Sequence, residues 1–508
     1  MATPIPENRA PFTLAEILRE TSGALASQGG LAEDQPLVGV STDTRALRPG
    51  ASFVALKGEA HDGHEHLEEA ARRGARVAIV ERSQGDVTVI PGLAIVRVPS
   101  TLVALGDLAR AHARRWRAQG SAASGRIVVG ITGSAGKTTT RLATTALLER
   151  LRPGRVHGSA GNLNNRIGVP MVLLGLEPAH EVAVVEMGMN RPGEIAELAR
   201  IAEPEVGVLT LIATAHTELC GSIEGVAAEK GALLRALPKD GVAIGNADDV
   251  RVRKQLIGTP ARRHHTYGRA FDADVRIAER RVAGLERSEL RIDRIGRGEI
   301  AFSTPLLGVA GALACAAAIA VAEIALGEEV TSEIAAAAFA VIDASAGAGR
   351  LAPRIFPSGL AVIDDSYNGN PASTCASITA ARELAEHAGR RLVLVLGEMK
   401  ELGASAASGH EEVGRAAAAS GAAQVIAIGG EAARIAALAA QGGVTAAFVD
   451  RVEDAAALAT HLVRPSDLVL VKGSRSVGAE RVVRALAAAH ADERAHDAAQ
   501  LGDKGDEP

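Results

Sequence analysis

The segment GITGSAGKTTT, residues 130–140, constrains the fold of this chain more than any other part of its sequence. An apolar run that is typical of a buried strand leads into a turn containing Gly133 and Gly136, and Lys137 follows at the start of an expected helix. Glycine permits the backbone angles that turn successive amides toward anionic oxygens, and the helix adds the positive end of its dipole. The segment therefore predicts a phosphate-binding loop in a parallel α/β sheet, with an ordinary strand-to-helix turn as the structural alternative.

Lys137 and the threonines after it provide the remaining groups of a triphosphate site. Lys137 would neutralise the outer phosphates, and the Thr138 hydroxyl would ligate a phosphate-bound magnesium ion. The spacing G-x-x-G-K-T is shorter than the common G-x-x-x-x-G-K-[ST] form, which indicates a variant of the loop. The residues expected to bind the nucleotide phosphates are Gly133, Ser134, Ala135, Gly136, Lys137, Thr138 and Thr139.

Length and composition indicate a globular chain of several domains. The 508 residues exceed what one hydrophobic core serves and favour about three domains. A net charge of -5 with interspersed signs leaves no basic stripe for nucleic acid and no polybasic patch for a membrane. The 3 cysteines are far apart and form no C-x-x-C pair, and the amino terminus lacks a secretory pattern, so a cytoplasmic protein is expected.

The longest apolar stretch, residues 305–322, approaches the length that spans a membrane. It consists mostly of Ala and Gly, contains Pro305 and is followed by Glu323. This composition predicts a buried, closely packed helix rather than membrane insertion.

Strand-like and helical patterns alternate in three blocks, which predicts an α/β fold of three domains. We expect a small α/β N-terminal domain over residues 1–122 and a central, doubly wound, mainly parallel sheet around the phosphate loop over residues 123–345. A Rossmann-like C-terminal domain is expected over residues 346–488, followed by a disordered polar tail, 489–508. Strands are expected, among others, at residues 37–40 and 206–211.

Three polar side chains follow elements that should meet at the phosphate edge of the central sheet. Glu186 ends an apolar strand, His216 follows the next one, and Lys230 lies on a helical pattern fourteen residues later. Because nucleotides bind at the carboxyl ends of parallel strands, we interpret Glu186 as a magnesium ligand and expect His216 to face the phosphates. Taken singly, each has an alternative: a satisfied polar residue at a strand end, or a solvated helical lysine.

With these residues identified, the chain resembles the Mur ligases, the ATP-dependent amide-forming family of peptidoglycan precursor synthesis. The resemblance covers nearly the whole chain. The similar segments are STDTR (41–45), FVALKGEAHDGH (53–64), TGSAGKTTT (132–140), GNLNNRIGVP (161–170), VVEMGMN (184–190), AHTELCGSIEGVAAEKG (215–231) and NADD (246–249).

The carboxyl-terminal block is similar to one branch of that family, which adds D-alanyl-D-alanine to UDP-MurNAc-tripeptide. The segments concerned are DDSYNGNP (364–371), LGEMKELG (396–403) and VKGSRSVGAE (471–480). The neighbouring ligase that adds the third amino acid carries DNPR-like and GKGHE-like motifs instead, which this chain lacks. The alternatives are another Mur-type or folylpolyglutamate-synthase-like ligase, and a non-catalytic nucleotide-binding module.

The resemblance implies that ATP phosphorylates the tripeptide carboxylate and that the amino group of D-Ala-D-Ala attacks the resulting acyl phosphate. It implies two magnesium ions, the first held by Thr138 and Glu186. The second would be held by His216 and by Lys230 converted to a carbamate. The catalytic residues implied are Lys137, Lys230 and His216. The resemblance also implies a cytoplasmic enzyme, expected to be a monomer.

The resemblance also implies contacts to the nucleotide and the substrates at positions that match those of the family. Arg350 matches a phosphate-contacting arginine, Asp364 a ribose contact, and Asn246 is a candidate adenine contact. The residues expected to bind UDP-MurNAc-tripeptide or the incoming dipeptide are Thr42, Asp43, Thr44, Arg45, Lys57, Gly58, Asn164, Asn368 and Asn370. The NGNP segment is equally compatible with a plain turn.

One segment departs from the family pattern. Family members carry H-N-x-x-N on the helix near residue 310, whose asparagine helps to hold adenine, whereas this chain has Ala310, Gly311 and Ala314. Adenine recognition is therefore expected to come from other groups, including backbone that small side chains allow to approach closely.

Overall fold

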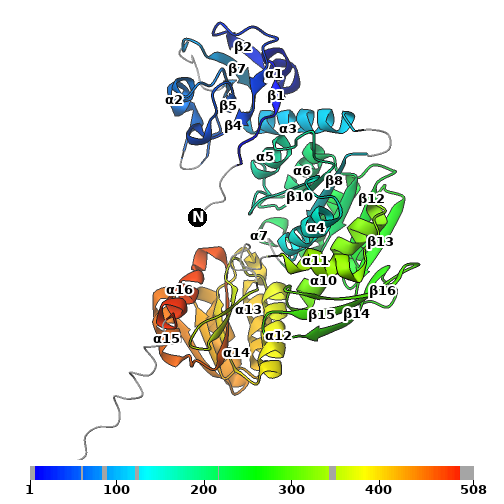
Figure 1. Ribbon diagram of the computed structural model, residues 1–508. Coiled ribbons are helices and arrows are strands. Elements are labelled where there is room, and N and C mark those ends of the chain that lie inside the picture. The colour runs from blue at the N-terminus through cyan, green and yellow to red at the C-terminus, as the bar shows by residue number, and fades with distance from the viewer. Residues whose placement is uncertain are drawn as a thin grey trace, which may run out of the picture.

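The computed structural model describes residues 6–58, 61–82, 89–120, 125–214, 217–342 and 351–491. Over this part of the chain, three α/β units follow one another from the N-terminus to the C-terminus (Figure 1). They are built on sheets of five, nine and six strands. The predicted fold class, α/β with a mainly parallel central sheet and a Rossmann-like C-terminal unit, is confirmed.

The first unit is a five-stranded sheet in the order β2-β7-β6-β5-β4, with β1 paired separately to β3. The expected single strand at 37–40 is wrong: it is interrupted at Gly39, whose φ is +90° and whose Cβ, if present, would lie 2.4 Å from the Asn8 carbonyl oxygen. The elements are β1 (Pro11–Phe12), α1 (Leu14–Thr21), β2 (Ala24–Ser27), β3 (Leu37–Val38), β4 (Val40–Ser41), β5 (Ser52–Val54), α2 (Leu67–Arg72), β6 (Val77–Glu81), β7 (Ala94–Val98) and α3 (Thr101–Ala118).

The central unit has the strand order β16-β15-β14-β13-β12-β11-β8-β10-β9, parallel from β9 to β14 and antiparallel from β14 to β16. Its strands are β8 (Ile127–Thr132), β9 (Val156–Gly158), β10 (Val182–Glu186), β11 (Val206–Leu209), β12 (Val242–Asn246), β13 (Arg263–Gly268), β14 (Val275–Val282), β15 (Ser288–Arg294) and β16 (Gly298–Thr304). Its helices are α4 (Lys137–Leu151), α5 (Gly168–Leu174), α6 (Glu194–Ala202), α7 (Thr217–Cys220), α8 (Ile223–Arg235), α9 (Val250–Ile257), α10 (Gly308–Ala320) and α11 (Ser332–Ala340).

Strand β8 is buried on both faces because helices cover both sides of the sheet. Val129 and Ile131 pack into a core with α4, α10 and α11, whereas Val128 faces a core with α3, α5 and α6. A strand buried in this way is a nearly continuous apolar run, as β8 is from Ile127 to Ile131. Since β8 lies between β10 and β11 and all three are parallel, their carboxyl ends open at one edge.

The apolar stretch near residue 310 forms α10 and a short π-helix, Val321–Ala325. By length and composition, residues 308–325 form the one helix in the described residues that could cross a membrane, and 72% of it is buried in the fold. The predicted buried helix is confirmed.

The third unit has the order β17-β18-β22-β19-β20-β21, with only β17 antiparallel to its neighbour among the described strands. Helices α12, α13 and α14 cover one face, and α15 and α16 the other. The elements are β17 (Ala352–Ile355), β18 (Ala361–Asp365), α12 (Pro371–Ala388), β19 (Arg391–Gly397), the 3-10 turn η5 (Gly403–Ser405), α13 (Ala406–Ala418), β20 (Gln424–Ile428), α14 (Ala433–Gln441), β21 (Thr445–Val449), α15 (Val452–Leu462), β22 (Asp467–Lys472) and α16 (Glu480–Ala489).

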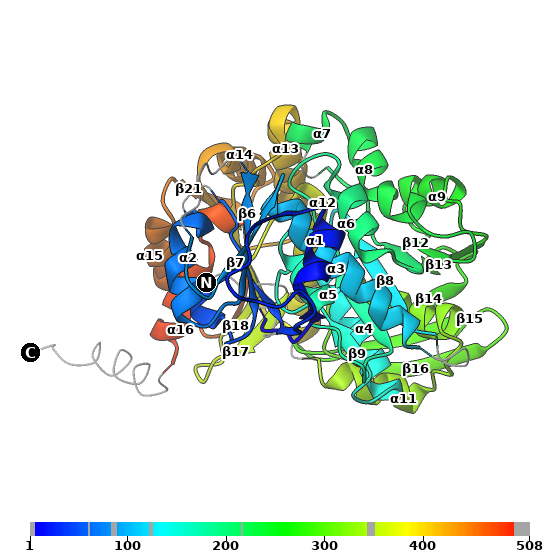
Figure 2. The ribbon, with the colours of Figure 1, turned by 90° about the horizontal axis from the view of Figure 1, so that it is seen from above.

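The units contact each other through helices. Helix α3 packs on α1 of the first unit and on α5 and α6 of the central unit, so these two units share a core cluster. Helix α10 of the central unit packs on α12 of the third unit. Figure 2, seen from above, shows α3 close to both α1 and α5. The edge at which β8, β10 and β11 end also faces the third unit, because Asn370 Nδ2 of that unit donates to the Ser134 carbonyl after β8 at 3.4 Å.

Candidate nucleotide and metal site

The turn after β8 has the shape that the glycines predicted. Gly133 has φ +153°, and a Cβ there would lie 2.0 Å from the Thr210 hydroxyl oxygen. Gly136, with φ +82°, is the N-cap of α4. Thr210, which the sequence analysis did not select, donates its hydroxyl to the Ala135 carbonyl at 2.6 Å and supports the turn from β11. The expected strand at 206–211 ends earlier, at Leu209.

The polar side chains of the loop make contacts within the central unit. Lys137 Nζ donates to the Gly133 carbonyl at 2.8 Å and so lies over the loop. The Ser134 hydroxyl donates to the Ala213 carbonyl at 3.1 Å and accepts from the Ala213 amide at 3.0 Å. Thr138 is buried and Thr139 half-buried in the first turn of α4. The helix start thus faces the loop, the arrangement that binds phosphate.

The carboxylate of Glu186, at the end of β10, accepts hydrogen bonds from three side chains. Its Oε2 accepts from the Thr138 hydroxyl at 2.8 Å and from Arg141 Nε at 3.2 Å, and its Oε1 accepts from Asn164 Nδ2 at 2.8 Å. The carboxylate is only 1% exposed. Thr138 and Glu186, selected as ligands of one ion, and Asn164, selected as a substrate contact, are thus in direct contact.

These groups fit a magnesium ion by their chemistry. A carboxylate and a hydroxyl at hydrogen-bond distance are oxygen ligands of the kind that Mg²⁺ binds beside nucleotide phosphates. Arg141 is an addition that the sequence analysis missed: it also donates to the Ser159 carbonyl and, at 3.3 Å, to the Gly161 carbonyl. It therefore fixes the Glu186 carboxylate against the segment that follows β9.

Lys230 lies fully buried on α8. Its Nζ has no hydrogen-bond partner among the residues that the structure describes. Burial, and secondarily the charge of Lys137, lowers the pKa of Lys230 from 10.5 to about 7. The neighbouring Glu229 accepts from the amides of Gly193 at 2.8 Å and Ile195 at 3.0 Å, which fixes α8 against α6. His216, the other expected ligand, lies outside the described residues.

The expected nucleoside contacts lie on two units. Asn246 is buried at the end of β12, and its Oδ1 accepts from the Asp248 amide at 3.0 Å. Asp364 is buried at the end of β18 and accepts from the Ser366 hydroxyl at 2.6 Å. Arg350 lies outside the described residues.

Near the start of α10, one of the positions that depart from the H-N-x-x-N pattern has no room for a side chain. A Cβ at Gly311 would lie 2.5 Å from the Leu306 carbonyl carbon. Ala314 is 1% exposed and packs in the core. The helix therefore presents backbone and small side chains where the family pattern has His and Asn, as the sequence indicated.

The loop after β18 is held by an ion pair that the sequence analysis missed. Lys472 Nζ donates to Asp365 Oδ2 at 2.6 Å and to the Asn368 carbonyl at 3.0 Å. Asn370 caps α12 by accepting from the Ser373 amide at 2.9 Å, and its Nδ2 donates to the Ser134 carbonyl at 3.4 Å. The candidate dipeptide loop therefore contacts the phosphate loop directly.

The candidate substrate residues of the first unit form a separate group. Arg45 pairs with Asp43 at 2.7 Å, and this hydrogen bond lowers the pKa of Asp43 below its usual value of 3.8. The buried Thr42 hydroxyl oxygen has no partner in the described part of the chain. Thr44 begins a 3-10 turn. Lys57 Nζ lies 3.6 Å from Asp62, and the Gly58 amide donates to the His61 carbonyl at 2.8 Å.

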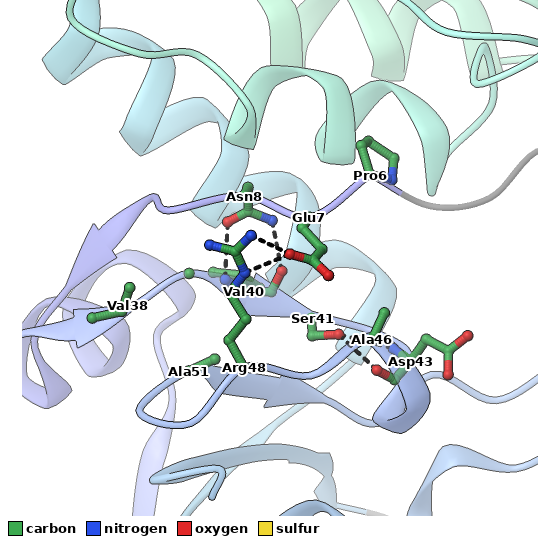
Figure 3. Close-up of a pocket in the computed structure, with 11 residues that line it drawn as sticks. Pro6, Glu7, Asn8, Val38, Val40, Ser41, Asp43, Ala46, Arg48 and Ala51 are labelled. Carbon is green, nitrogen blue, oxygen red and sulfur yellow. Dashed lines mark hydrogen bonds and ion pairs between the residues drawn. The ribbon is translucent and has the colours of Figure 1, made fainter. Parts of the chain in front are cut away.

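A small pocket borders this group (Figure 3). Asp43 and Ser41 lie on one side of it, and Asn8 and the Glu7–Arg48 ion pair lie on the other. Asn8 is held by Val40, whose carbonyl accepts from Asn8 Nδ2 at 2.7 Å. The pocket volume of about 20 Å³ suits a water molecule rather than a nucleobase. No motif in the sequence pointed to residues 7, 8 and 48, because they come from separate segments.

The chain is similar to known proteins over nearly its whole length. Three protein-family models match: the Mur ligase family catalytic domain over residues 36–113, the Mur ligase middle domain over residues 131–322, and the Mur ligase glutamate ligase domain over residues 349–475. UDP-N-acetylmuramoyl-tripeptide–D-alanyl-D-alanine ligase of Escherichia coli (strain K12) is 36% identical over 481 residues, which are 93% of this chain and 98% of that protein.

Two solved structures have the same architecture. A crystal structure of MurF from Acinetobacter baumannii is similar with a TM-score of 0.81 and 28% identity, over 94% of this chain and 99% of that one. MurF ligase from Thermotoga maritima in complex with ADP is similar with a TM-score of 0.75 and 28% identity, over 88% of this chain and 96% of that one.

Proposed function

Because the chain belongs to the Mur ligase family, we propose that it joins D-alanyl-D-alanine to UDP-MurNAc-tripeptide with ATP as the energy source. The observation that carries the proposal is the 36% identity over 93% of the chain to a ligase of that name, since it spans all three units. The site agrees with it: the phosphate loop, the Glu186 cluster and the third-unit loop at Asn370 meet at one edge of the central sheet.

The reaction forms a carbon-nitrogen bond between an activated carboxylate and an amine. The terminal carboxylate oxygen of the tripeptide attacks the γ-phosphorus of ATP, which gives an acyl phosphate and ADP. The amino group of D-Ala-D-Ala then attacks the acyl carbon, loses a proton, and expels inorganic phosphate from the tetrahedral intermediate. The barrier is largely electrostatic, because two anionic groups must meet in the first step.

Residues of the central unit would lower this barrier by binding and orienting charge. Lys137 and the amides of the loop would bind the outer phosphates, as their position at the start of α4 allows. Thr138 and Glu186 would hold a magnesium ion that neutralises phosphate charge. Arg141 and Asn164 keep the Glu186 carboxylate in one orientation.

We further propose that Lys230 acts as a carbamate. An amine with a pKa of about 7 is largely neutral at slightly alkaline pH, and a neutral amine adds to CO₂ with loss of one proton to give an anionic carbamate. The buried Nζ without a hydrogen-bond partner among the described residues supports this modification. The carbamate oxygens, with His216, would hold a second magnesium ion.

The remaining assignments complete the proposal. We infer that residues 42–45, Lys57 and Gly58 bind the uridine nucleotide, with the unpartnered Thr42 hydroxyl as one contact. Asn368 and Asn370 would orient the dipeptide. Asn246 and Asp364 would contact the nucleoside of ATP, and Arg350 would contact its phosphates. Cytoplasmic substrates and the absence of disulfides among Cys220, Cys315 and Cys375 support a cytoplasmic enzyme. We expect a monomer.

A nucleotide-binding module without ligase activity is the second candidate. The small residues at the start of α10 favour it, because they offer no side chain to the base. It predicts ATP binding without phosphate release that depends on both acceptors.

The test measures phosphate release from ATP with magnesium and UDP-MurNAc-tripeptide, with and without D-Ala-D-Ala, while mass spectrometry follows the pentapeptide product. Release that depends on both acceptors, with product of the right mass, establishes the ligase. Lys137→Met is the inactive comparison, and Lys254→Met, at an exposed lysine on α9, is the matched control. ATP binding without dependent release would establish the binding module instead.

A further inference from the structure

Two different kinds of contact join the central and third units. Near α10 the contact is apolar: Leu307 is buried in the core of the third unit, and a Cβ at Gly308 would lie 2.9 Å from Ala380 on α12. An ion pair between Arg280 and Glu383 at 2.5 Å lies on the same side. Shared apolar burial of this kind makes the α10–α12 seam the persistent part of the interface.

The second contact is polar and lies at α7. The Thr217 hydroxyl donates to the Leu402 carbonyl at 2.9 Å, and the Glu218 amide donates to the Glu401 carbonyl at 3.4 Å. Gly403 faces the same helix: the three atoms nearest to a Cβ at this position all belong to Glu218, the closest at 2.8 Å. Helix α7 contacts the 3-10 turn η5 of the third unit, and both ribbon views place α7 beside that unit (Figures 1 and 2).

The loop that docks on α7, residues 398–403, is held rigidly by its own unit. Its Met399 amide donates to the buried His410 Nε2 at 2.9 Å, and its Lys400 amide donates to the Ser474 hydroxyl at 2.9 Å. Glu401 has φ +65°, a left-handed conformation that a residue with a side chain keeps only when its surroundings impose it. The loop is therefore a preformed surface rather than one shaped by docking.

Helix α7 occupies the connection between the phosphate edge and Lys230. In the sequence Thr217 follows His216 directly. On its other side, Ser222 caps α8 by accepting from the Gly225 amide at 3.1 Å, and α8 carries Lys230. A contact on α7 thus reaches the segment between two groups of the proposed reaction.

We propose that docking of loop 398–403 on α7 is a latch that holds the third unit in catalytic register, with Thr217 and Gly403 as its positioning residues. Together with the Asn370 contact to the phosphate loop, it fixes the polar side of the interface. The apolar α10–α12 seam acts as the pivot. The catalytic role of the latch rests on the proposed ligase activity, but its effect on domain docking does not.

Two glycine substitutions distinguish the loss of the latch from a general loss of stability. Gly403→Ala and Gly389→Ala both place a Cβ at a positive φ, +52° and +61°, so they carry a similar backbone strain. Nothing lies within 4 Å of a Cβ at Gly389, whereas at Gly403 it meets α7. We expect Gly403→Ala to lower kcat by about tenfold or more and to raise KM for D-Ala-D-Ala, with Gly389→Ala within about twofold of the wild type.

A hydroxyl series at Thr217 tests the hydrogen bond itself. Thr217→Val keeps the shape and removes the donor to Leu402, and we expect kcat to fall by about five- to tenfold. Thr217→Ser restores the donor and should recover activity to within about twofold of the wild type. If Thr217 had a purely structural role, variants of equal thermal stability would have the same kcat whether they carried Val or Ser.

Small-angle scattering of the full chain with a non-hydrolysable ATP analogue measures docking without reference to ligation. We expect a larger radius of gyration for Gly403→Ala than for the wild type and Gly389→Ala. A wild-type profile for Gly403→Ala would overturn the latch, as would equal losses of kcat in the two glycine variants. If no variant ligates, the proposed function fails, and the scattering comparison still decides the latch.

Discussion

Replacement of Lys230 by methionine is expected to stabilise the protein while abolishing its activity. The Lys230 side chain is fully buried and its Nζ has no hydrogen-bond partner among the described residues. Methionine has a similar length and needs no solvation, so Lys230→Met removes the unfavourable burial of an amine. A site kept at the expense of stability is typical of function.

The magnitude and its pH dependence follow from the pKa of Lys230. The pKa is 10.5 in an exposed lysine and about 7 in the fold; at 1.36 kcal/mol for each pH unit this difference is about 5 kcal/mol. Because the folded pKa is the lower one, the unfolded state binds more protons between these values. The destabilisation is fully present below pH 7 and is lost as the pH rises toward 10.5, with about 3 kcal/mol left at pH 8.5.

The assay is urea unfolding of the wild type and Lys230→Met from pH 6.5 to 9.5 in CO₂-free buffer. The free-energy advantage of the variant should shrink steadily as the pH rises. Lys254→Met, at an exposed position on α9, should show no such trend. A pH-independent difference between Lys230→Met and the wild type would refute the reasoning, because it would mean that Lys230 has the same pKa in both states.

Bicarbonate provides the second arm of this experiment. If the neutral amine forms a carbamate, added bicarbonate should raise both the activity and the unfolding midpoint of the wild type and leave Lys230→Met unchanged. Intact-protein mass spectrometry after chemical trapping of the carbamate measures the modification directly. An unmodified lysine under bicarbonate would contradict the carbamate and leave the pH argument standing.

Three further outcomes are expected. Glu186→Gln leaves the buried Arg141 guanidinium beside a neutral amide, so it should destabilise the protein by about 3 kcal/mol and raise the half-saturating magnesium concentration about tenfold; an unchanged magnesium titration would contradict its role. Gly133→Ala should lower ATP affinity about a hundredfold by calorimetry because its Cβ would meet the Thr210 hydroxyl, whereas Gly125→Ala, with open space around its Cβ, should bind normally. Thr42→Val removes a buried hydroxyl without a partner among the described residues, so it should not lower stability and should raise KM for the UDP substrate about fivefold; an unchanged KM would remove Thr42 from the substrate site.

The geometry of the site that could be anticipated from the sequence depends on local pattern. The turn at Gly133 and Gly136 was recognisable because only glycine tolerates its positive φ angles. Thr138 and Glu186 could be placed together because adjacent parallel strands end at the same edge, and the structure joins them at 2.8 Å. The complete assignment of the site residues stays a prediction, with His216 and Arg350 outside the described residues.

The parts that were missed or wrong depend on distant contacts. Arg141 meets Glu186 across 45 residues of sequence, Thr210 meets Ala135 across 75, and Lys472 meets Asp365 across 107. No periodicity signals such a pair. The strand expected to continue through 211 stops at Leu209 because Thr210 turns to support the phosphate loop.

The sequence by itself determined the α/β class, the phosphate loop and the family, since strand polarity, glycine conformation and motif order are properties of short segments. The tertiary structure alone decided the strand order, the burial that lowers the pKa of Lys230, and the docking of the third unit on α7 and the phosphate loop. These features are set by which surfaces exclude water from one another, and that depends on residues hundreds of positions apart.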